Sequence, residues 1–185
     1  MTTKHKNLLN EVKNHGLIIP KITPDNWVLG GLTKLKGEVI NPSGSWRNYL
    51  PENEPQSTVK YESYACTCFG SNNAVETLLR FKGLNENKSD RFLAVVSGIN
   101  PNQGGDPHIV CETYRKKGAT AESSLPFTSD IDTVNKFYSP KPMSDALLQE
   151  GESFLERYDV NHEWVFNGGS PSEKKAKLKG LLLER

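Results

Sequence analysis

Apolar residues recur at intervals of three and four along several stretches of this chain, which is the spacing of an amphipathic helix. The strongest such stretch runs from Cys66 to Phe81, and Gly83 follows it in the position of a helix C-cap. Cap and stop residues place further helices at 90–96, 108–117, 144–158 and 172–183. Because strict alternation of apolar and polar residues is rare, the pattern predicts a mostly α chain with few and weak strands.

The first 60 residues follow a different pattern. Residues 1–15 carry a few apolar positions among Lys and Asn, and they fit either a weak polar helix or a mobile arm. Pro and Gly interrupt every short apolar piece over 16–60, so we expect an extended segment that Trp27 and Trp46 pin to a surface. The chain therefore divides into an N-terminal arm (1–40), a helical subdomain (41–140) and two further helices (141–185).

Composition narrows the class of protein. The 23 Lys and Arg residues almost balance the 22 Asp and Glu residues, for a net charge of +1. This balance argues against a general binder of nucleic acid or of anionic membranes. No apolar run approaches the roughly 18 residues of a membrane-spanning helix, and the polar N-terminus lacks the apolar block of a signal peptide. Three cysteines fit no disulfide framework, which favours a reducing compartment such as the cytoplasm.

Two of the cysteines, Cys66 and Cys68, lie in the first turn of the strongest predicted helix. The helix dipole and the N–H groups at a helix start favour a thiolate, which is the nucleophilic form, and the same groups can stabilise an oxyanion. The structural alternative is that small cysteines simply pack well there. The third cysteine, Cys111, falls on the apolar side of its helix and is expected in the core. The three do not have zinc-site spacing, and no phosphate loop or dinucleotide fingerprint occurs, so we expect neither a metal nor a cofactor.

The residues around Cys66 resemble the nucleophile region of papain-like cysteine peptidases, whose helix begins Cys-Trp-Ala-Phe-Ser and carries a Glu ten positions after the Cys. With Cys66 as the nucleophile, Phe69 and Glu76 match the family Phe and Glu, whereas Thr67 stands in place of Trp. With Cys68 as the nucleophile, the later Phe and Glu fall out of step. Cys66 is therefore favoured, and Cys68 is interpreted as a packing residue.

The resemblance continues on both sides of this helix. Upstream, Pro-Ser-Gly-Ser-Trp-Arg at 42–47 is similar to the Pro…Asp-Trp-Arg that opens the family domain, with Ser in place of Asp. Downstream, the similar stretches are Ser-Asp-Arg-Phe-Leu at 89–93, Asn-Gln-Gly-Gly-Asp-Pro at 102–107 and Leu-Pro-Phe at 125–127. Ser63 stands where secreted relatives have a disulfide cysteine, as a reducing compartment allows.

This resemblance implies roles for four residues and a peptide or protein substrate. Cys66 would attack the peptide carbonyl. Gln56 would line the oxyanion hole with its amide, although it lies a few positions further from Cys66 than is usual and a plain loop amide is the alternative. Gly104 and Gly105 would pair their backbone with an extended substrate, which requires close approach without a Cβ.

The mechanism also needs an imidazole that accepts the thiol proton. In the family, that His and its Asn partner belong to a β-barrel half that follows the helical half. Here His5 and His15 lie in the polar arm, His108 is expected to be an exposed helix-start residue, and His162 falls on the crossover before the catalytic His. The expected fold is thus the helical half of a papain-like α+β fold, with 141–185 as crossover helices and the barrel half missing.

Two classes of function stay open. The first is a papain-like cysteine peptidase that is inactive as this chain alone. The second is a non-catalytic structural or binding module with the same fold, such as a bacteriophage particle component associated with the virion, because Thr67, Gln56 and the absent base all depart from the family. A cysteine-based transferase is a third possibility. The face that would meet the barrel should be apolar and covered by the missing half or by another protein chain.

Overall fold

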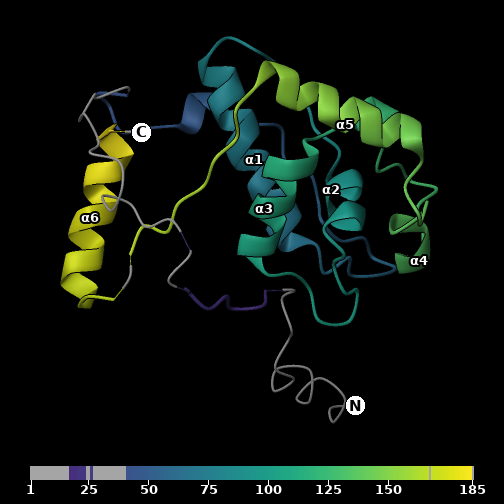
Figure 1. Ribbon diagram of the computed structural model, residues 1–185, viewed down its shortest axis with the longest axis horizontal. Coiled ribbons are helices and arrows are strands. Elements are labelled where there is room, and N and C mark those ends of the chain that lie inside the picture. The colour runs from purple at the N-terminus through teal and green to yellow at the C-terminus, as the bar shows by residue number, and fades with distance from the viewer. Residues whose placement is uncertain (1–16, 24–25, 27–40, 167, 185) are drawn as a thin grey trace, which may run out of the picture.

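The computed structural model describes residues 17–23, 26, 41–166 and 168–184, so the predicted helix or arm at 1–15 and Trp27 lie outside the described residues. The helices are α1 (Cys66–Phe81), α2 (Asp90–Val96), α3 (Pro107–Lys117), α4 (Val134–Phe137), α5 (Asp145–Arg157) and α6 (Pro171–Glu184), with 3-10 turns η2 (Arg47–Tyr49) and η3 (Glu122–Ser124) (Figure 1). Among these residues β-pairing occurs as isolated bridges rather than as strands. The prediction of a mostly α chain is confirmed for this part of the protein.

Local capping signals explain where most helices begin. Ser89 and Ser144 each accept a hydrogen bond from a backbone N–H in the first turn of the helix that follows. The third helix begins one residue earlier than predicted, because Asp106 caps it and Pro107 takes the first helical position. None of the predicted helices covers 119–138, but this stretch contains η3 and the short helix α4, which Thr133 caps.

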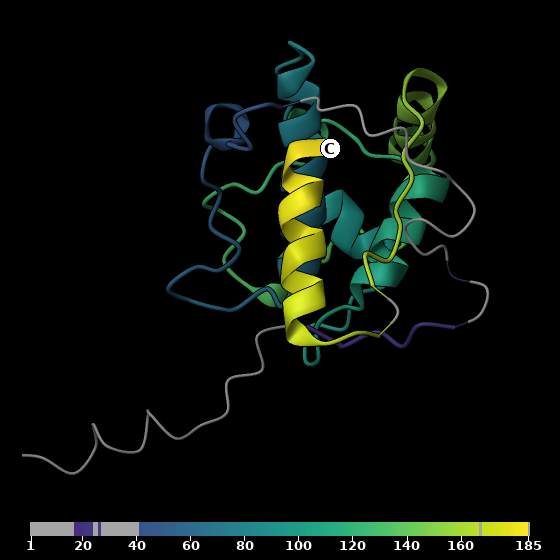
Figure 2. The ribbon, with the colours of Figure 1, turned by 90° about the vertical axis from the view of Figure 1, so that its left-hand side faces the viewer.

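Helix α3 lies at the centre of the helical body, where it packs against α1, α2 and α5 (Figures 1 and 2). Large side chains from all of these elements fill the space between them. The buried core includes Phe69, Leu93, Tyr114, Phe137 and Phe154. The ring centroids of Tyr114 and Phe154 lie 5.8 Å apart in an edge-to-face arrangement that joins α3 to α5. This packing fixes the first turns of α1 and α3 relative to each other.

Buried polar side chains on α1 attach that helix to the start of α2. The Asn72 amide donates a hydrogen bond of 2.7 Å to the Asp90 carboxyl, and a Glu76 carboxyl oxygen accepts one of 2.7 Å from the backbone N–H of Lys88. Burial raises the pKa of both carboxyl groups. Glu76 therefore holds the loop before α2.

Helix α6 stands to the left of the helical body in Figure 1, and in Figure 2, which shows the molecule from that side, it lies in front of the other helices. Residues 158–166, which we call the crossing segment, lead toward it from the end of α5 and pass α1 and α3 (Figure 1). Leu178 on α6 is 47% exposed. No helix in the described ranges is both long and apolar enough to cross a membrane.

The half-buried carboxyl of Glu122 makes the free energy of unfolding depend on pH. Its carboxyl accepts a hydrogen bond from the Phe127 backbone N–H, but one of its oxygens is buried without a partner, and burial raises its pKa to about 7. A carboxyl whose pKa is higher in the folded than in the unfolded chain favours folding only while it is protonated. The free energy of unfolding should therefore fall by about 1 kcal/mol, after allowance for partial exposure, as the pH rises from about 4.5 to about 7.

Urea unfolding at pH 5 and pH 8 measures this loss. Glu122→Gln keeps the shape of the side chain and removes its titration, so the variant should lose less stability over this range than the wild type. Identical pH profiles for the two proteins would contradict the assignment.

Candidate functional site

Cys66 is the first residue of α1, and a turn that hydrogen bonds hold in place comes directly before it. Tyr64 has a φ of 60°, a left-handed conformation that is uncommon for residues other than glycine. The buried Ser63 fixes this turn, because its hydroxyl accepts a hydrogen bond of 3.2 Å from the Ala65 N–H and its carbonyl accepts one of 2.7 Å from the Tyr138 hydroxyl. Ser63 thus holds the turn before Cys66 by hydrogen bonds.

The two cysteines of this turn have different surroundings. Cys68 is 0% exposed and belongs to the core, whereas Cys66 is half-buried and lines a cavity. Burial raises the pKa of both thiols, and it raises that of Cys68 the more strongly. A hydrogen bond from the Thr67 backbone N–H opposes the rise at Cys66, and the Glu62 carboxylate adds to it. Cys66 is therefore the accessible thiol of the pair, but the helix start alone does not make it a thiolate at neutral pH.

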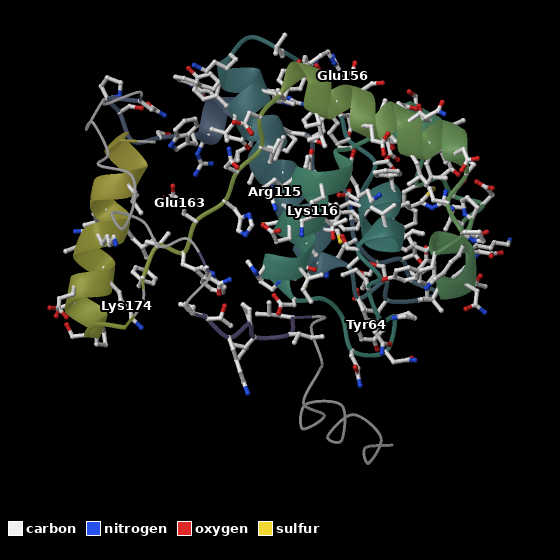
Figure 3. The ribbon with its side chains drawn as sticks, viewed as in Figure 1. Tyr64, Arg115, Lys116, Glu156, Glu163 and Lys174 are labelled. Atoms are coloured by element: carbon white, nitrogen blue, oxygen red, sulfur yellow. The ribbon has the colours of Figure 1, made fainter. Side chains whose placement is uncertain are left out.

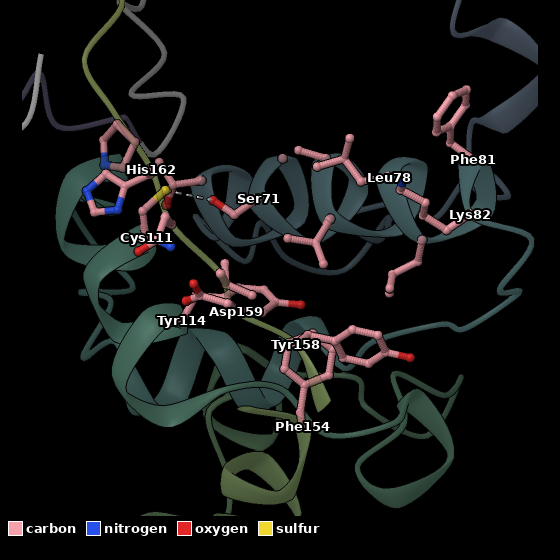
Figure 4. A pocket seen from close by; sticks show the side chains of 18 of the residues that line it. Ser71, Leu78, Phe81, Lys82, Cys111, Tyr114, Phe154, Tyr158, Asp159 and His162 are labelled. Carbon is pink, nitrogen blue, oxygen red and sulfur yellow. Dashed lines mark hydrogen bonds between the residues drawn. The ribbon is translucent and has the colours of Figure 1, made fainter. Parts of the chain in front are cut away.

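The cavity next to Cys66 has a volume of about 740 Å³ and lies between α1, α3 and the crossing segment (Figure 4). Its lining is mostly apolar. Residues that line it include Cys66, Gly70, Ser71, Ala74 and Leu78 of α1, Cys111 and Tyr114 of α3, and 158–162 of the crossing segment. Leu78 is 51% exposed, so the apolar lining continues onto the surface. The described residues thus include an exposed apolar face along α1, whereas the expected contact of such a face with a missing half stays a prediction.

Each of the two predicted substrate-binding glycines is also required by the local fold. Gly104 has a φ of 86°, which side chains rarely adopt. A Cβ on Gly105 would lie 2.6 Å from the Thr67 hydroxyl oxygen and 2.2 Å from Cδ1 of Ile99. Gly105 therefore packs directly against the first turn of α1, next to Cys66.

The outer edge of Gly105 pairs with an extended piece of the N-terminal arm. The backbone N–H of Ile18 donates a hydrogen bond of 2.9 Å to the Gly105 carbonyl, and Leu17 forms a parallel bridge with Gly105. Leu17 also lines the cavity. The edge that the family resemblance assigns to substrate thus pairs with a segment of the chain itself.

Gln56 does not join this cluster. It is half-buried at a bend just before the bridge between Ser57 and Glu62, and it is not among the described residues that line the cavity with Cys66. The structure therefore brings Cys66 close to Gly105 through Thr67 and leaves Gln56 outside the cavity.

The surroundings of the histidines correct one prediction. His108 was expected to be exposed, but it is half-buried, with its Nδ1 3.0 Å from Nε2 of His162 and its ring centroid 5.8 Å from that of Trp164. Burial lowers the pKa of His162. His162 lines the same cavity as Cys66. The aromatic setting of His162 was visible in the sequence, but its partner 54 residues away was not.

Cys111 also differs from its prediction. It was expected in the core, but it is half-buried and lines the cavity, with its sulfur 3.9 Å from the Ser71 hydroxyl (Figure 4). Burial raises the pKa of its thiol. Within the described ranges, no group of three or more His, Cys, Asp and Glu side chains is placed to hold a metal ion.

No family model matches this chain, and comparisons with curated proteins and with solved structures give no match either. The function is therefore inferred from the residues and geometry of the site.

Proposed function

We propose that this chain forms the helical half of a papain-like cysteine peptidase, with Cys66 as the nucleophile. The observation that supports this most directly is the pairing of the Gly105 edge with extended backbone, through the hydrogen bond of 2.9 Å from the Ile18 N–H to the Gly105 carbonyl. That edge packs against the first turn of the Cys66 helix. A nucleophile next to an edge that accepts extended chain is what peptide cleavage requires.

In the proposed reaction, the Cys66 sulfur attacks the peptide carbonyl carbon and its proton passes to a base. The Cys66 backbone N–H would hold the oxyanion, as the family resemblance implies. The C–N bond then breaks, the amine leaves with the proton from the base, and water hydrolyses the thioester. Because burial keeps the Cys66 pKa high, this chemistry needs an imidazole at the thiol. In the family the barrel half supplies that imidazole.

A peptide that carries a thiol-reactive chloromethyl ketone tests the proposal without requiring turnover. For each reagent, the rate of Cys66 modification is divided by the rate at which the same reagent modifies glutathione. We expect this relative rate to be at least about tenfold higher for the peptide reagent than for the same reactive group without a peptide. A tenfold ratio corresponds to about 1.4 kcal/mol of peptide recognition. Mass spectrometry after digestion identifies the modified cysteine.

Two variants provide the controls. Cys66→Ser should abolish the fast modification, whereas Cys111→Ser removes the other cavity thiol and should leave it intact. Modification of Cys66 no faster than that of glutathione would contradict the proposal. Steady hydrolysis of a peptide substrate by a variant that lacks both His108 and His162 would contradict the need for an external imidazole.

The second candidate is a non-catalytic module with the same fold, whose exposed apolar face along α1 binds another protein chain. Two observations favour it: Gln56 lies outside the cavity, and the pKa of Cys66 is raised rather than lowered. The same experiment separates the two candidates. Cys66 that reacts like an ordinary thiol, with no preference for the peptide reagent, would favour the structural module.

A further inference from the structure

Two segments that are distant in sequence meet at one side chain beside the cavity. His108 lies at the start of α3, directly after the Gly104–Gly105 loop. Its Nε2 is 3.2 Å from the side-chain amide nitrogen of Asn26, which belongs to the N-terminal arm, and its Nδ1 is 3.0 Å from Nε2 of His162, in the crossing segment. One imidazole therefore fastens both segments to α3.

The hydrogen bond between the two rings limits how many protons the pair can hold. In the neutral pair, the Asn26 amide donates to His108 Nε2, and His108 Nδ1–H donates to Nε2 of His162. One additional proton is compatible with this bond, because an imidazolium can donate to a neutral imidazole. A second additional proton puts N–H groups on both facing nitrogens, and the bond is lost. The contact thus requires that at least one of the two facing nitrogens stays unprotonated.

The Glu112 carboxylate favours the protonated form of His162, but it does not hydrogen-bond to the ring. The other ring nitrogen of His162, Nδ1, is buried without a hydrogen bond, 3.8 Å from the Glu112 carboxylate. That carboxylate is engaged on α3 by Arg115 at 2.8 Å and Lys116 at 3.0 Å, which lie beside the crossing segment (Figure 3). These ion pairs lower the Glu112 pKa to about 2, so its charge stays constant in the range where histidine titrates.

The remaining neighbours are accounted for in the same way. Arg115 and His108 both oppose a positive charge on His162, and Glu112 favours it. Asp106 accepts a hydrogen bond of 2.8 Å from the His108 backbone N–H at the helix cap. The described contact from the N-terminal arm is the neutral amide of Asn26, and the crossing segment adds the indole of Trp164 and the adjacent carboxyl of Glu163.

We propose that the His108–His162 pair is a proton-sensitive clasp, which holds the crossing segment over the cavity at neutral pH and releases it when both rings are protonated. The consequence is controlled access to the cavity and to its Cys111 thiol. This inference does not depend on the peptidase proposal, because it concerns the cover of the cavity and not the chemistry inside it.

The direction of the pH effect follows from linkage. The pKa of His162 is lowered in the clasped state by burial and by His108, and in a released segment it returns to about 6.5. Between these two values the released state binds a proton that the clasped state does not bind. The clasped state is therefore favoured above about pH 6.5, and its population relative to the released state falls by up to about tenfold for each pH unit below that value.

Thiol accessibility measures the release. In a Cys66→Ser background, modification of Cys111 by 4,4′-dithiodipyridine, a disulfide that reacts at acidic pH, is followed at pH 7 and pH 5 and divided by the rate for glutathione. The relative rate at pH 5 should be at least about fivefold higher than the relative rate at pH 7. A change of this size is within the roughly tenfold per pH unit that the release of one proton-linked contact allows. A relative rate that stays constant or falls toward pH 5 would overturn the proposal.

Two comparisons make the result specific. His162→Phe in the same background keeps an aromatic ring but cannot take a proton, so the relative modification rates of Cys111 at pH 7 and pH 5 should agree within about twofold. His15→Asn should keep the full increase in this rate from pH 7 to pH 5. A step that persists in His162→Phe overturns the clasp. Cys68 is fully buried and serves as an internal control, because its modification in parallel with Cys111 would show global unfolding instead of local release and would also overturn the proposal.

Discussion

Gly118→Ala is expected to destabilise the protein by about 4 kcal/mol or more, the largest effect of any single methyl group that we predict. Gly118 ends α3 with φ 66° and ψ −148°, a backbone conformation that is essentially restricted to glycine. A Cβ at this position would lie 1.8 Å from the carbonyl oxygen of Gly151 on α5. Since that oxygen belongs to the backbone of a packed helix, relief requires α3 and α5 to move apart.

Urea unfolding monitored by circular dichroism measures this loss, and Gly83→Ala is the matched control. Gly83 follows α1 with φ 81°, but no atom outside its neighbours lies within 4 Å of a Cβ built there. Alanine at Gly83 should therefore cost only about 1 kcal/mol for the backbone conformation. Equal losses for the two variants would show that the contact between α3 and α5 is not what makes Gly118 necessary.

Gly118 also shows which features of the fold the sequence predicts and which it does not. A glycine after a helical pattern is a local stop signal, and the helix does end there, just as Ser89 and Ser144 begin helices by capping neighbours a few residues away. The contact with Gly151 joins residues 33 positions apart, and no periodicity encodes it. Helix positions were therefore predictable from short-range patterns, whereas the packing that makes Gly118 irreplaceable was not.

The same distinction between short-range patterns and long-range packing applies to the candidate site. The place of Cys66 at the start of a helix was predictable, because it depends on one stretch of sequence. Its raised pKa was not, because the main cause is burial in the folded chain, which a helix pattern does not encode. The pairing of His108 with His162 and the exclusion of Gln56 from the cavity likewise depend on how distant loops pack.

Arg91 is the clearest structural residue that the sequence did not identify. It is 6% exposed, and its guanidinium donates to backbone carbonyls of a single irregular region. The acceptors are the carbonyls of Phe137 at 3.1 Å, Pro126 at 2.6 Å, Lys136 at 2.9 Å and Ser139 at 2.5 Å. One side chain on α2 thus satisfies the polar groups that hold residues 126–139, including the end of α4, against the core.

Arg91→Met keeps most of the aliphatic stem and removes all of these donors, so we expect a loss of about 3–5 kcal/mol in the free energy of unfolding. Arg157→Met is the matched control, because its side chain is 57% exposed and its ion pair with Glu86 spans 3.5 Å; it should change stability by no more than about 0.5 kcal/mol. Because the lost bonds all converge on 126–139, limited proteolysis of Arg91→Met should cut first within that range, at urea concentrations where the Arg157 variant is intact. Cleavage that begins elsewhere, or losses of similar size in the two variants, would mean that this region is held by its own packing and not by the arginine.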